Sequence, residues 1–250
     1  MPDSNISEIF YRESLYPLQN RILSVIRELC PSLYLTGGTA LSRFYFSHRY
    51  SDDLDLFTNE EAFFPDIVEK AVSGIMKIDG IKLKNTENSI GTGYLRLDVT
   101  EGDTCLTVDF VNDIAFRLGI PEEREGVRVD TLPNIFTNKI SALIGRDELK
   151  DIVDVREICR NCRFDWSKVI EVSAEKEASV DSEYIDFKLA SLVEFLGNHP
   201  DFLNTINWIR KPEPGSFISD LEEIRKDVLS LDKNTLCPDS ATPLEDLIQN

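Results

Sequence analysis

The first half of the chain alternates between helical and extended spacing of its apolar residues. Residues 18–29 place apolar side chains three or four positions apart, which predicts an amphipathic helix, and Pro31 follows as a stop. Residues 33–36 form a short apolar run that indicates a buried strand. The same patterns predict a helix at 39–46, a strand at 54–57, a helix at 62–76, and the two strands of a hairpin at 94–100 and 106–111. This half is therefore expected to build a β-sheet flanked by helices.

The second half has long helical patterns. Apolar stripes at 135–144 and 152–158 are followed by predicted helices at 181–196, 201–209 and 219–231, with a proline-rich loop at 211–216. Five aromatic residues are expected in the core of this region: Trp166, Trp208, Phe187, Phe195 and Phe202. We predict an α+β protein in which a first domain, residues 1–131, precedes a helical domain, residues 132–250.

Composition and charge narrow the class of protein and the partners that it can have. A hydrophobic content of 42% and a charged content of 29% are typical of soluble globular proteins. The formal net charge of −18 repels polyanions, so we expect no DNA partner, and an RNA substrate would need a local basic patch. No apolar run approaches the ~20 residues that span a bilayer, and the first residues are acidic, so we expect a cytoplasmic protein without a membrane partner.

The cysteines do not indicate a metal site. Their number, five, is odd, which suits reduced thiols. Cys159 and Cys162 have the spacing of a metal-binding pair, but no second pair or histidine cluster completes a tetrahedral site. We therefore expect a structural role for both. His48 lies near the chemistry described next, and a helix-end or surface role is at least as well supported for it.

Gly37 and Gly38 separate the predicted strand at 33–36 from the helix that follows. A glycine turn at a helix N-terminus lets the backbone approach a phosphate, and the N–H groups favour the anion. Asp53 and Asp55 then follow on the next predicted strand, where side chains two residues apart share a face. Carboxylates held that close repel each other unless a cation binds them, and Mg²⁺ prefers oxygen ligands. The pattern predicts a Mg²⁺ site beside a phosphate-binding turn.

Two further charged residues lie in apolar surroundings. Asp109 interrupts the predicted strand 106–111, and an acid there is seldom buried unless it is paired or bound to a metal. It could bind a second Mg²⁺ or act as the general base for an acceptor hydroxyl, provided that its strand lies beside Asp53 and Asp55. Lys139 lies in an apolar helical stretch, where a lysine either extends to solvent or meets an anion.

Four segments resemble one family. They are GGTAL at 37–41, RYSDDLDLF at 49–57, TVDF at 107–110 and KISALIGRDELKDIVDV at 139–155. Together they are similar to the AbiEii/AbiGii-type toxin nucleotidyltransferases, which belong to the polymerase-β-like minimal nucleotidyltransferase superfamily. The resemblance spans about the first two-thirds of the chain. It implies a nucleotidyltransferase-like mixed sheet flanked by helices, followed by a helical domain that contributes Lys139 and Asp151 to the cleft.

The resemblance also implies roles for individual residues. Asp53, Asp55 and Asp109 would bind Mg²⁺, and these three form the catalytic set with Lys139 and Asp151. The nucleotide would be bound by Gly37, Gly38, Thr39, Ser51, Lys139 and Arg146. Asp154 is a weaker candidate. The family often has Arg-Asp where this chain has Lys150-Asp151, and a lysine lacks the bidentate fork, so no phosphate role is carried over to Lys150.

The predicted reaction is the Mg²⁺-dependent transfer of a nucleoside monophosphate from an NTP to an acceptor hydroxyl. The resemblance suggests the toxin of a bacterial toxin–antitoxin or phage-defence pair, with tRNA as acceptor and a cognate antitoxin protein as partner. Two alternatives stay open. One is a nucleotide-binding partner module without turnover, and the other is a nucleotidyltransferase that modifies a protein, which the strong negative charge favours.

Overall fold

The computed structural model describes residues 8–89 and 93–244, which form two compact units. The first, here called the sheet unit, comprises Met1–Phe44, Tyr50–Ala115 and Pro121–Asp130. The second, the helical unit, comprises Tyr45–Arg49, Phe116–Ile120 and Thr131–Asn250. Within the described residues, no helix has both the length and the apolar character that crossing a bilayer requires.

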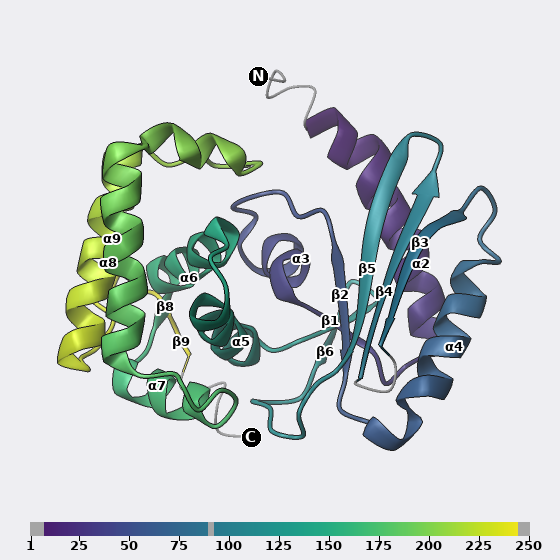
Figure 1. The fold of residues 1–250 in the computed structure, drawn as a ribbon, viewed down its shortest axis with the longest axis horizontal. Helices are drawn as coiled ribbons and strands as arrows, with labels where there is room; N and C mark the ends of the chain where they lie inside the picture. The colour runs from purple at the N-terminus through teal and green to yellow at the C-terminus, as the bar shows by residue number, and fades with distance from the viewer. Residues whose placement is uncertain (1–7, 90–92, 245–250) are drawn as a thin grey trace. The chain divides into compact units, whose positions relative to one another are not determined.

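The sheet unit is built on a mixed seven-stranded sheet (Figure 1). Its strands are β1 (Tyr34–Thr36), β2 (Leu54–Thr58), β3 (Lys82–Ser89), β4 (Tyr94–Glu101), β5 (Thr104–Asn112), β6 (Glu122–Arg124) and β7 (Val127–Val129). They are ordered β3-β4-β5-β2-β1-β7-β6. β2 pairs with β5 in parallel and β1 pairs with β7 in parallel, whereas the other neighbours are antiparallel. The two central strands, β2 and β1, thus join segments far apart in the sequence.

The burial pattern explains why these residues form strands. All three residues of β1 are buried, and β2 alternates between buried and half-buried positions, as a strand does when only one face enters the core. The flanking helices are η1 (Tyr11–Leu15), α2 (Tyr16–Leu29), α3 (Gly37–Leu41), η2 (Ser42–Phe46), η3 (Glu61–Phe63) and α4 (Phe64–Ile75). α2 and α4 lie side by side (Figure 1), and a side chain at Gly74 of α4 would overlap Val25 and Leu29 of α2. The α+β architecture predicted from the sequence is confirmed.

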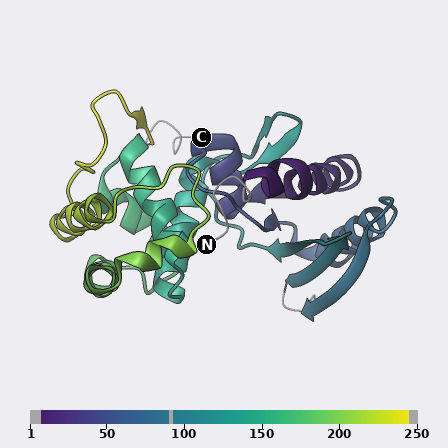
Figure 2. The same ribbon diagram turned by 90° about the horizontal axis from the view of Figure 1, so that it is seen from above.

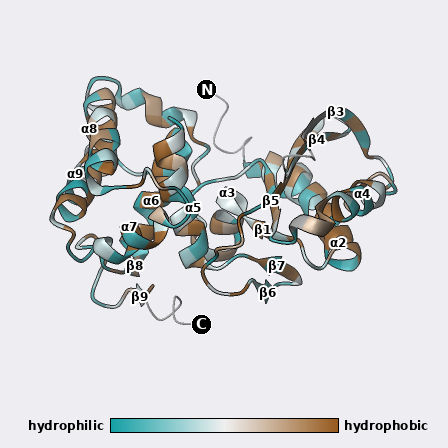
Figure 3. Ribbon diagram, turned by 60° about the horizontal axis from the view of Figure 1, so that its bottom comes forward, coloured by the Kyte–Doolittle hydropathy of each residue, from teal (hydrophilic) through white to brown (hydrophobic). Residues whose placement is uncertain are grey.

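The helical unit contains five α-helices in its described residues. They are α5 (Leu132–Gly145), α6 (Leu149–Asn161), α7 (Trp166–Ala174), α8 (Ser182–Asn198) and α9 (Pro214–Ser230), joined by the 3₁₀-helix η5 (Pro200–Thr205) and the short parallel pair β8 (Cys162–Arg163) and β9 (Thr242–Pro243). α8 and α9 run side by side in both views (Figures 1 and 2). Both helices mix brown and teal segments in Figure 3, as amphipathic helices do.

Two sequence predictions in this unit are wrong. The helix expected at 201–209 ends at Thr205, because the chain then turns and pairs with another segment: Trp208 forms a β-bridge with Arg49, and the Ile209 N–H donates to the His48 carbonyl at 3.2 Å. The loop expected at 211–216 ends early, because Pro214 starts α9 at a position where a proline suits a helix.

The expected aromatic core is only partly formed. Trp166 is fully buried against Phe136 and Phe164. Three other rings that were expected in the core are exposed: Phe187, Phe195 and Phe202. Helical periodicity identifies an apolar face but does not say whether another element covers it, and in the described part of the chain these rings line an open groove of about 460 Å³.

Candidate active site

Four neighbouring strands of the sheet place Arg96, Asp109, Asp55 and Thr36 in one row. Arg96 of β4 lies opposite Asp109 of β5, Asp109 lies opposite Asp55 of β2, and Asp55 lies opposite Thr36 of β1. Directly opposed residues share a face of a sheet, so both carboxylates project from the same side. Asp53 lies two residues before Asp55, directly ahead of the first residue of β2. Asp53 and Asp55 are half-buried.

The glycine turn, Gly37–Gly38, is packed against these aspartates. Gly37 has a φ of +66°, in the left-handed region, and a β-carbon there would overlap the Asp55 Oδ2 atom. The Thr39 hydroxyl, which is fully buried, donates to the Asp53 carbonyl. The turn therefore contacts both aspartates, at the side chain of Asp55 and at the backbone of Asp53. The hydroxyl proton of Thr39, which was expected at the triphosphate, is directed to the protein's own backbone.

Ser51 lies at the entry to the same strand. It is buried, and its carbonyl accepts a hydrogen bond from the Gln19 Nε2 atom at 3.3 Å. The Tyr11 hydroxyl donates to the carboxylate of Asp52. Both donors come from the N-terminal helices of the sheet unit, so these helices fix the backbone from which Asp53 projects.

Asp109 lies beside Asp55, and its carboxylate is engaged by two neighbours on β4. Arg96 donates from Nε to Oδ1 and from Nη2 to Oδ2, both at 2.8 Å, and the Tyr94 hydroxyl donates to Oδ1 at 3.0 Å. Consistent with this, no group of three or more His, Cys, Asp or Glu side chains in the described residues is arranged to hold a metal ion.

The donor chemistry at this turn nonetheless fits a hard divalent cation. Asp53 and Asp55 are half-buried acids at the start of β2, and carboxylate oxygens are what Mg²⁺ prefers. The absence of a side chain at Gly37 keeps the Asp55 carboxylate against the turn. Asp109 could join this pair only if its contacts with Arg96 rearranged.

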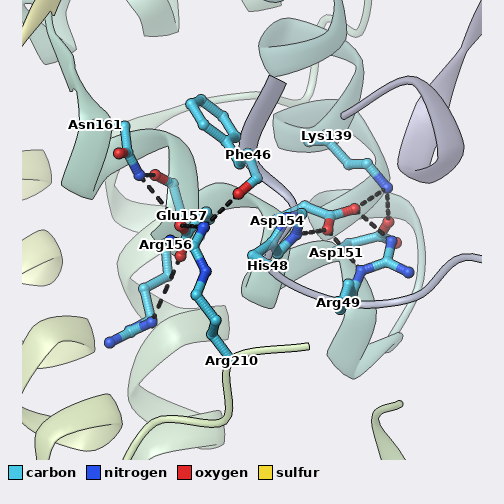
Figure 4. Close-up of polar contacts among 10 residues, drawn as sticks. All are labelled: Phe46, His48, Arg49, Lys139, Asp151, Asp154, Arg156, Glu157, Asn161 and Arg210. Atoms are coloured by element: carbon cyan, nitrogen blue, oxygen red, sulfur yellow. Dashed lines mark hydrogen bonds and ion pairs between the residues drawn. The ribbon is translucent and has the colours of Figure 1, made fainter. Parts of the chain in front are cut away.

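Lys139 belongs to a buried cluster in the helical unit, here called the charge cluster and shown in part in Figure 4. The Lys139 Nζ atom of α5 lies 2.8 Å from Asp151 Oδ1 and 2.7 Å from Asp154 Oδ2, both on α6. Arg146 also donates to Asp151, at 2.7 Å from Nε. The anion that Lys139 meets is therefore the protein's own pair of carboxylates.

The segment 45–49 completes the charge cluster. Arg49 donates to both oxygens of Asp154, at 2.8 Å each, and the His48 Nε2 atom lies 2.8 Å from Oδ1 (Figure 4). The cluster thus consists of His48, Arg49, Lys139, Arg146, Asp151 and Asp154. Apart from the histidine, it holds three cations and two carboxylates.

The cluster shifts the pKa values of its members. Burial alone would raise the pKa of the Asp154 carboxyl, but Arg49 and Lys139 overcome this and hold it well below its usual value. For Asp151, Lys139 and Arg146 outweigh burial in the same way and lower the pKa. Burial opposes the charged form of Lys139, yet Asp154 and Asp151 raise its pKa above the ordinary value. All three groups are therefore ionised near neutral pH.

Comparison with known families decides the identity. The family model described as "Nucleotidyl transferase AbiEii toxin, Type IV TA system" matches residues 21–210, which is most of the chain and includes every candidate residue. The chain belongs to the AbiEii nucleotidyltransferase toxin family. A search of curated proteins found no match.

Two solved Helicobacter pylori structures share the fold of this AbiEii-family protein, and a third structure is similar at a lower score. JHP933 from Helicobacter pylori is 16% identical, with 87% of this chain and 90% of that chain covered and a TM-score of 0.55. A second H. pylori protein, proposed to be a nucleotidyltransferase, is 18% identical, with 87% and 96% covered and a TM-score of 0.56. The nucleotidyltransferase toxin MenT4 from Mycobacterium tuberculosis is 12% identical, with 87% and 84% covered and a TM-score of 0.48.

The candidate residues of this toxin nucleotidyltransferase fall into two groups. The sheet unit holds Gly37, Gly38, Thr39, Ser51, Asp53, Asp55 and Asp109, whereas the helical unit holds Lys139, Arg146 and Asp151. Sequence reasoning missed Arg96. A signal was present, because Arg96 lies two residues after Tyr94 on a predicted strand and such residues share a face. It also missed Arg49, although this residue lies within the RYSDDLDLF segment. The surface role considered for His48 is wrong, because His48 is buried against Asp154.

Proposed function

We propose that this nucleotidyltransferase transfers a nucleoside monophosphate from an NTP to an acceptor hydroxyl and releases pyrophosphate, with Mg²⁺ held by Asp53 and Asp55. The observation that supports it most is the packing of the Asp55 carboxylate against Gly37, because it joins a metal-binding pair to a phosphate-binding turn. When bound, the cation would stabilise negative charge on the transferred phosphoryl group.

The protein's own groups have separate tasks in this proposal. The backbone N–H groups at Gly38 and Thr39 bind triphosphate oxygens, because the Thr39 hydroxyl is already donated to Asp53. Asp109 either completes the metal site or accepts the proton of the acceptor hydroxyl, and either role requires its carboxylate to be free of Arg96. Ser51 positions the strand entry through its backbone.

In the helical unit, Lys139 and Arg146 are proposed to contact nucleotide phosphates. The charge cluster supports this for Arg146, whose side chain is about half exposed. Lys139 is buried, so it could reach a phosphate only if its contacts with Asp151 and Asp154 rearranged. Asp151 acts as a positioning residue, since it is fully buried and accepts from both of these cations. The pKa of the Lys139 ammonium is raised, so it keeps its charge at neutral pH.

The biological setting follows from the family. A Type IV toxin–antitoxin family implies a cognate antitoxin, and we propose that the toxin acts on tRNA and serves in phage defence. A protein acceptor is the second candidate, because the net charge of −18 opposes the approach of a polyanion.

The test is label transfer. The protein is incubated with Mg²⁺ and each of the four α-labelled NTPs, with total RNA and with cell protein in separate reactions. We expect label in one acceptor class, loss of transfer in Asp53→Asn and Asp55→Asn, and unchanged transfer in Asp103→Asn, which alters an exposed turn. Label in RNA supports the tRNA proposal, and label in protein supports the second candidate. No transfer from any NTP to either class would overturn the proposed function.

A further inference from the structure

The Arg96–Asp109 pair is unusual because it occupies a carboxylate in the row that carries the proposed metal ligands. Arg96 and Asp109 are directly opposed on β4 and β5, and Asp109 is directly opposed to Asp55. The guanidinium spans both Asp109 oxygens, and Tyr94 takes a third hydrogen-bonding position. A carboxylate accepts about four hydrogen bonds, so little of its capacity is left for another ligand.

The two partners differ in their access to solvent. The side chain of Arg96 is 41% exposed, whereas that of Asp109 is 12% exposed. The arginine head is therefore the partner that can turn toward water, while the carboxylate stays in the sheet. The nearly buried carboxylate needs a partner of opposite charge, and a divalent cation shared with Asp53 and Asp55 would supply one in place of the guanidinium.

A released Arg96 would lie next to the anionic part of the substrate. Its guanidinium stays charged at any relevant pH, and its planar fork matches two phosphate oxygens as well as it matches a carboxylate. A cation at Asp109 would also repel a guanidinium that remained there.

We propose that Arg96 is a nucleotide-binding residue whose guanidinium is held by Asp109 until a divalent cation takes that carboxylate, after which it binds the NTP phosphates. The inference rests on the proposed function. It predicts effects of opposite sign: loss of Arg96 tightens metal binding in the absence of nucleotide and weakens nucleotide binding in the presence of metal.

The predicted effect on metal binding is tested by titrating Mn²⁺ without nucleotide and following free Mn²⁺ by electron paramagnetic resonance. We expect Arg96→Ala to tighten Mn²⁺ binding about threefold to tenfold, and Arg96→Lys to tighten it less, because lysine keeps the charge but loses the fork. Arg21→Ala is the matched control, since it removes a cation of similar exposure from the pair with Glu101 in the same unit. It should leave Mn²⁺ affinity unchanged.

A double-mutant cycle with Asp109→Asn separates exchange at the carboxylate from a general charge effect. If Arg96 acts through Asp109, Arg96→Ala has no effect on Mn²⁺ affinity in the Asp109→Asn background. Additive effects would overturn the inference. Thermal unfolding checks each variant, and Arg96→Gln replaces Arg96→Ala if that variant does not fold.

The predicted effect on nucleotide binding is tested with non-hydrolysable analogues of the four NTPs at saturating Mn²⁺. We expect Arg96→Ala to weaken binding of the preferred analogue about tenfold, as the loss of a charged phosphate contact does, and Arg96→Lys to restore part of it. Unchanged affinity would overturn the inference. If Asp53→Asn and Asp55→Asn leave Mn²⁺ binding intact, the proposed metal site itself is wrong. If Mn²⁺ binding depends on both Asp53 and Asp55 but the effects of Arg96→Ala and Asp109→Asn are additive, the proposed metal site stands and only the role of Arg96 is wrong.

Discussion

The carboxylate of Asp55 occupies the space into which a side chain at Gly37 would extend. Gly37 also has a positive φ, so two independent constraints favour glycine at this position. One is local to the backbone and costs any other residue about 1–2 kcal/mol. The other is specific to the site, because an added methyl group would displace a proposed metal ligand.

Gly37→Ala is therefore expected to reduce stability by about 2 kcal/mol and to lower Mn²⁺ affinity and label transfer at least tenfold. Gly102→Ala is the control, because Gly102 has a similar φ of +57° but an added β-carbon there would meet no neighbour within 4 Å. It should lose about 1 kcal/mol and keep full metal affinity. Urea unfolding and Mn²⁺ titration measure both quantities, and equal Mn²⁺ affinity in the two variants would contradict the structural relationship.

Lys139→Met tests the charge cluster. The substitution leaves Asp151 and Asp154 fully buried with fewer cations, so we expect a loss of about 3 kcal/mol in the free energy of unfolding. Lys188→Met is the matched control, since Lys188 pairs with Asp147, whose side chain is 90% exposed, and should lose less than 1 kcal/mol. Denaturant titration gives both values. Similar losses would show that burial of the carboxylates does not govern the stability of the cluster.

Much of the sheet unit could be predicted because its periodicity is strong. β2 alternates strictly, and the glycine turn marks where β1 ends. β3 was missed because its residues, Lys82–Ser89, are mostly polar and it pairs only with β4 at the edge of the sheet. β6 and β7 were missed because their residues, EER and VRV, lack the apolar run that marks the equally short β1.

The candidate site was predictable in its residue types but not in its pairings. Asp109 could be singled out because an acid in an apolar strand needs a partner, yet periodicity does not say that Arg96 is the residue opposite it. In the same way Lys139 was expected either to extend to solvent or to meet an anion, and only the packing of α5 on α6 identifies Asp151 and Asp154. Long-range pairing depends on register and helix packing, which local sequence does not encode.

The thiols are expected to differ in reactivity with iodoacetamide. Burial raises the pKa of Cys162 to about 12 and raises that of the fully buried Cys159 well above its ordinary value, so neither forms the nucleophilic thiolate near neutral pH. Cys105 is exposed. In native protein at about pH 8, Cys105 should react first, and Cys159 and Cys162 should react only after unfolding. Mass spectrometry of tryptic peptides identifies the modified sites. Early modification of Cys159 would contradict a purely structural role for this pair.

Stability should depend on pH through the charge cluster. The pKa of Asp154 is lowered on folding below its ordinary value of 3.8. The ionised carboxylate therefore stabilises the protein fully at pH values above 3.8, and this contribution is lost as the pH falls through the folded-state pKa. The pKa of Lys139 is raised above its ordinary value of 10.5. The stabilisation by its ammonium group is therefore fully present at pH values below 10.5 and is lost as the pH rises through the folded-state pKa. The cluster should therefore contribute fully between about pH 5 and pH 9.

Asp154→Asn tests the acid side of this dependence. The variant should be less stable than the wild type at pH 7, because Arg49 and Lys139 lose a buried counter-ion, and the difference should shrink as the pH falls below about 4. Urea unfolding from pH 3 to pH 7 gives the difference at each pH. Asp103→Asn, on an exposed turn, should follow the wild-type curve throughout. If the stability difference between Asp154→Asn and the wild type stayed constant over the whole range, the lowered pKa of Asp154 would not contribute to the stability of the folded protein.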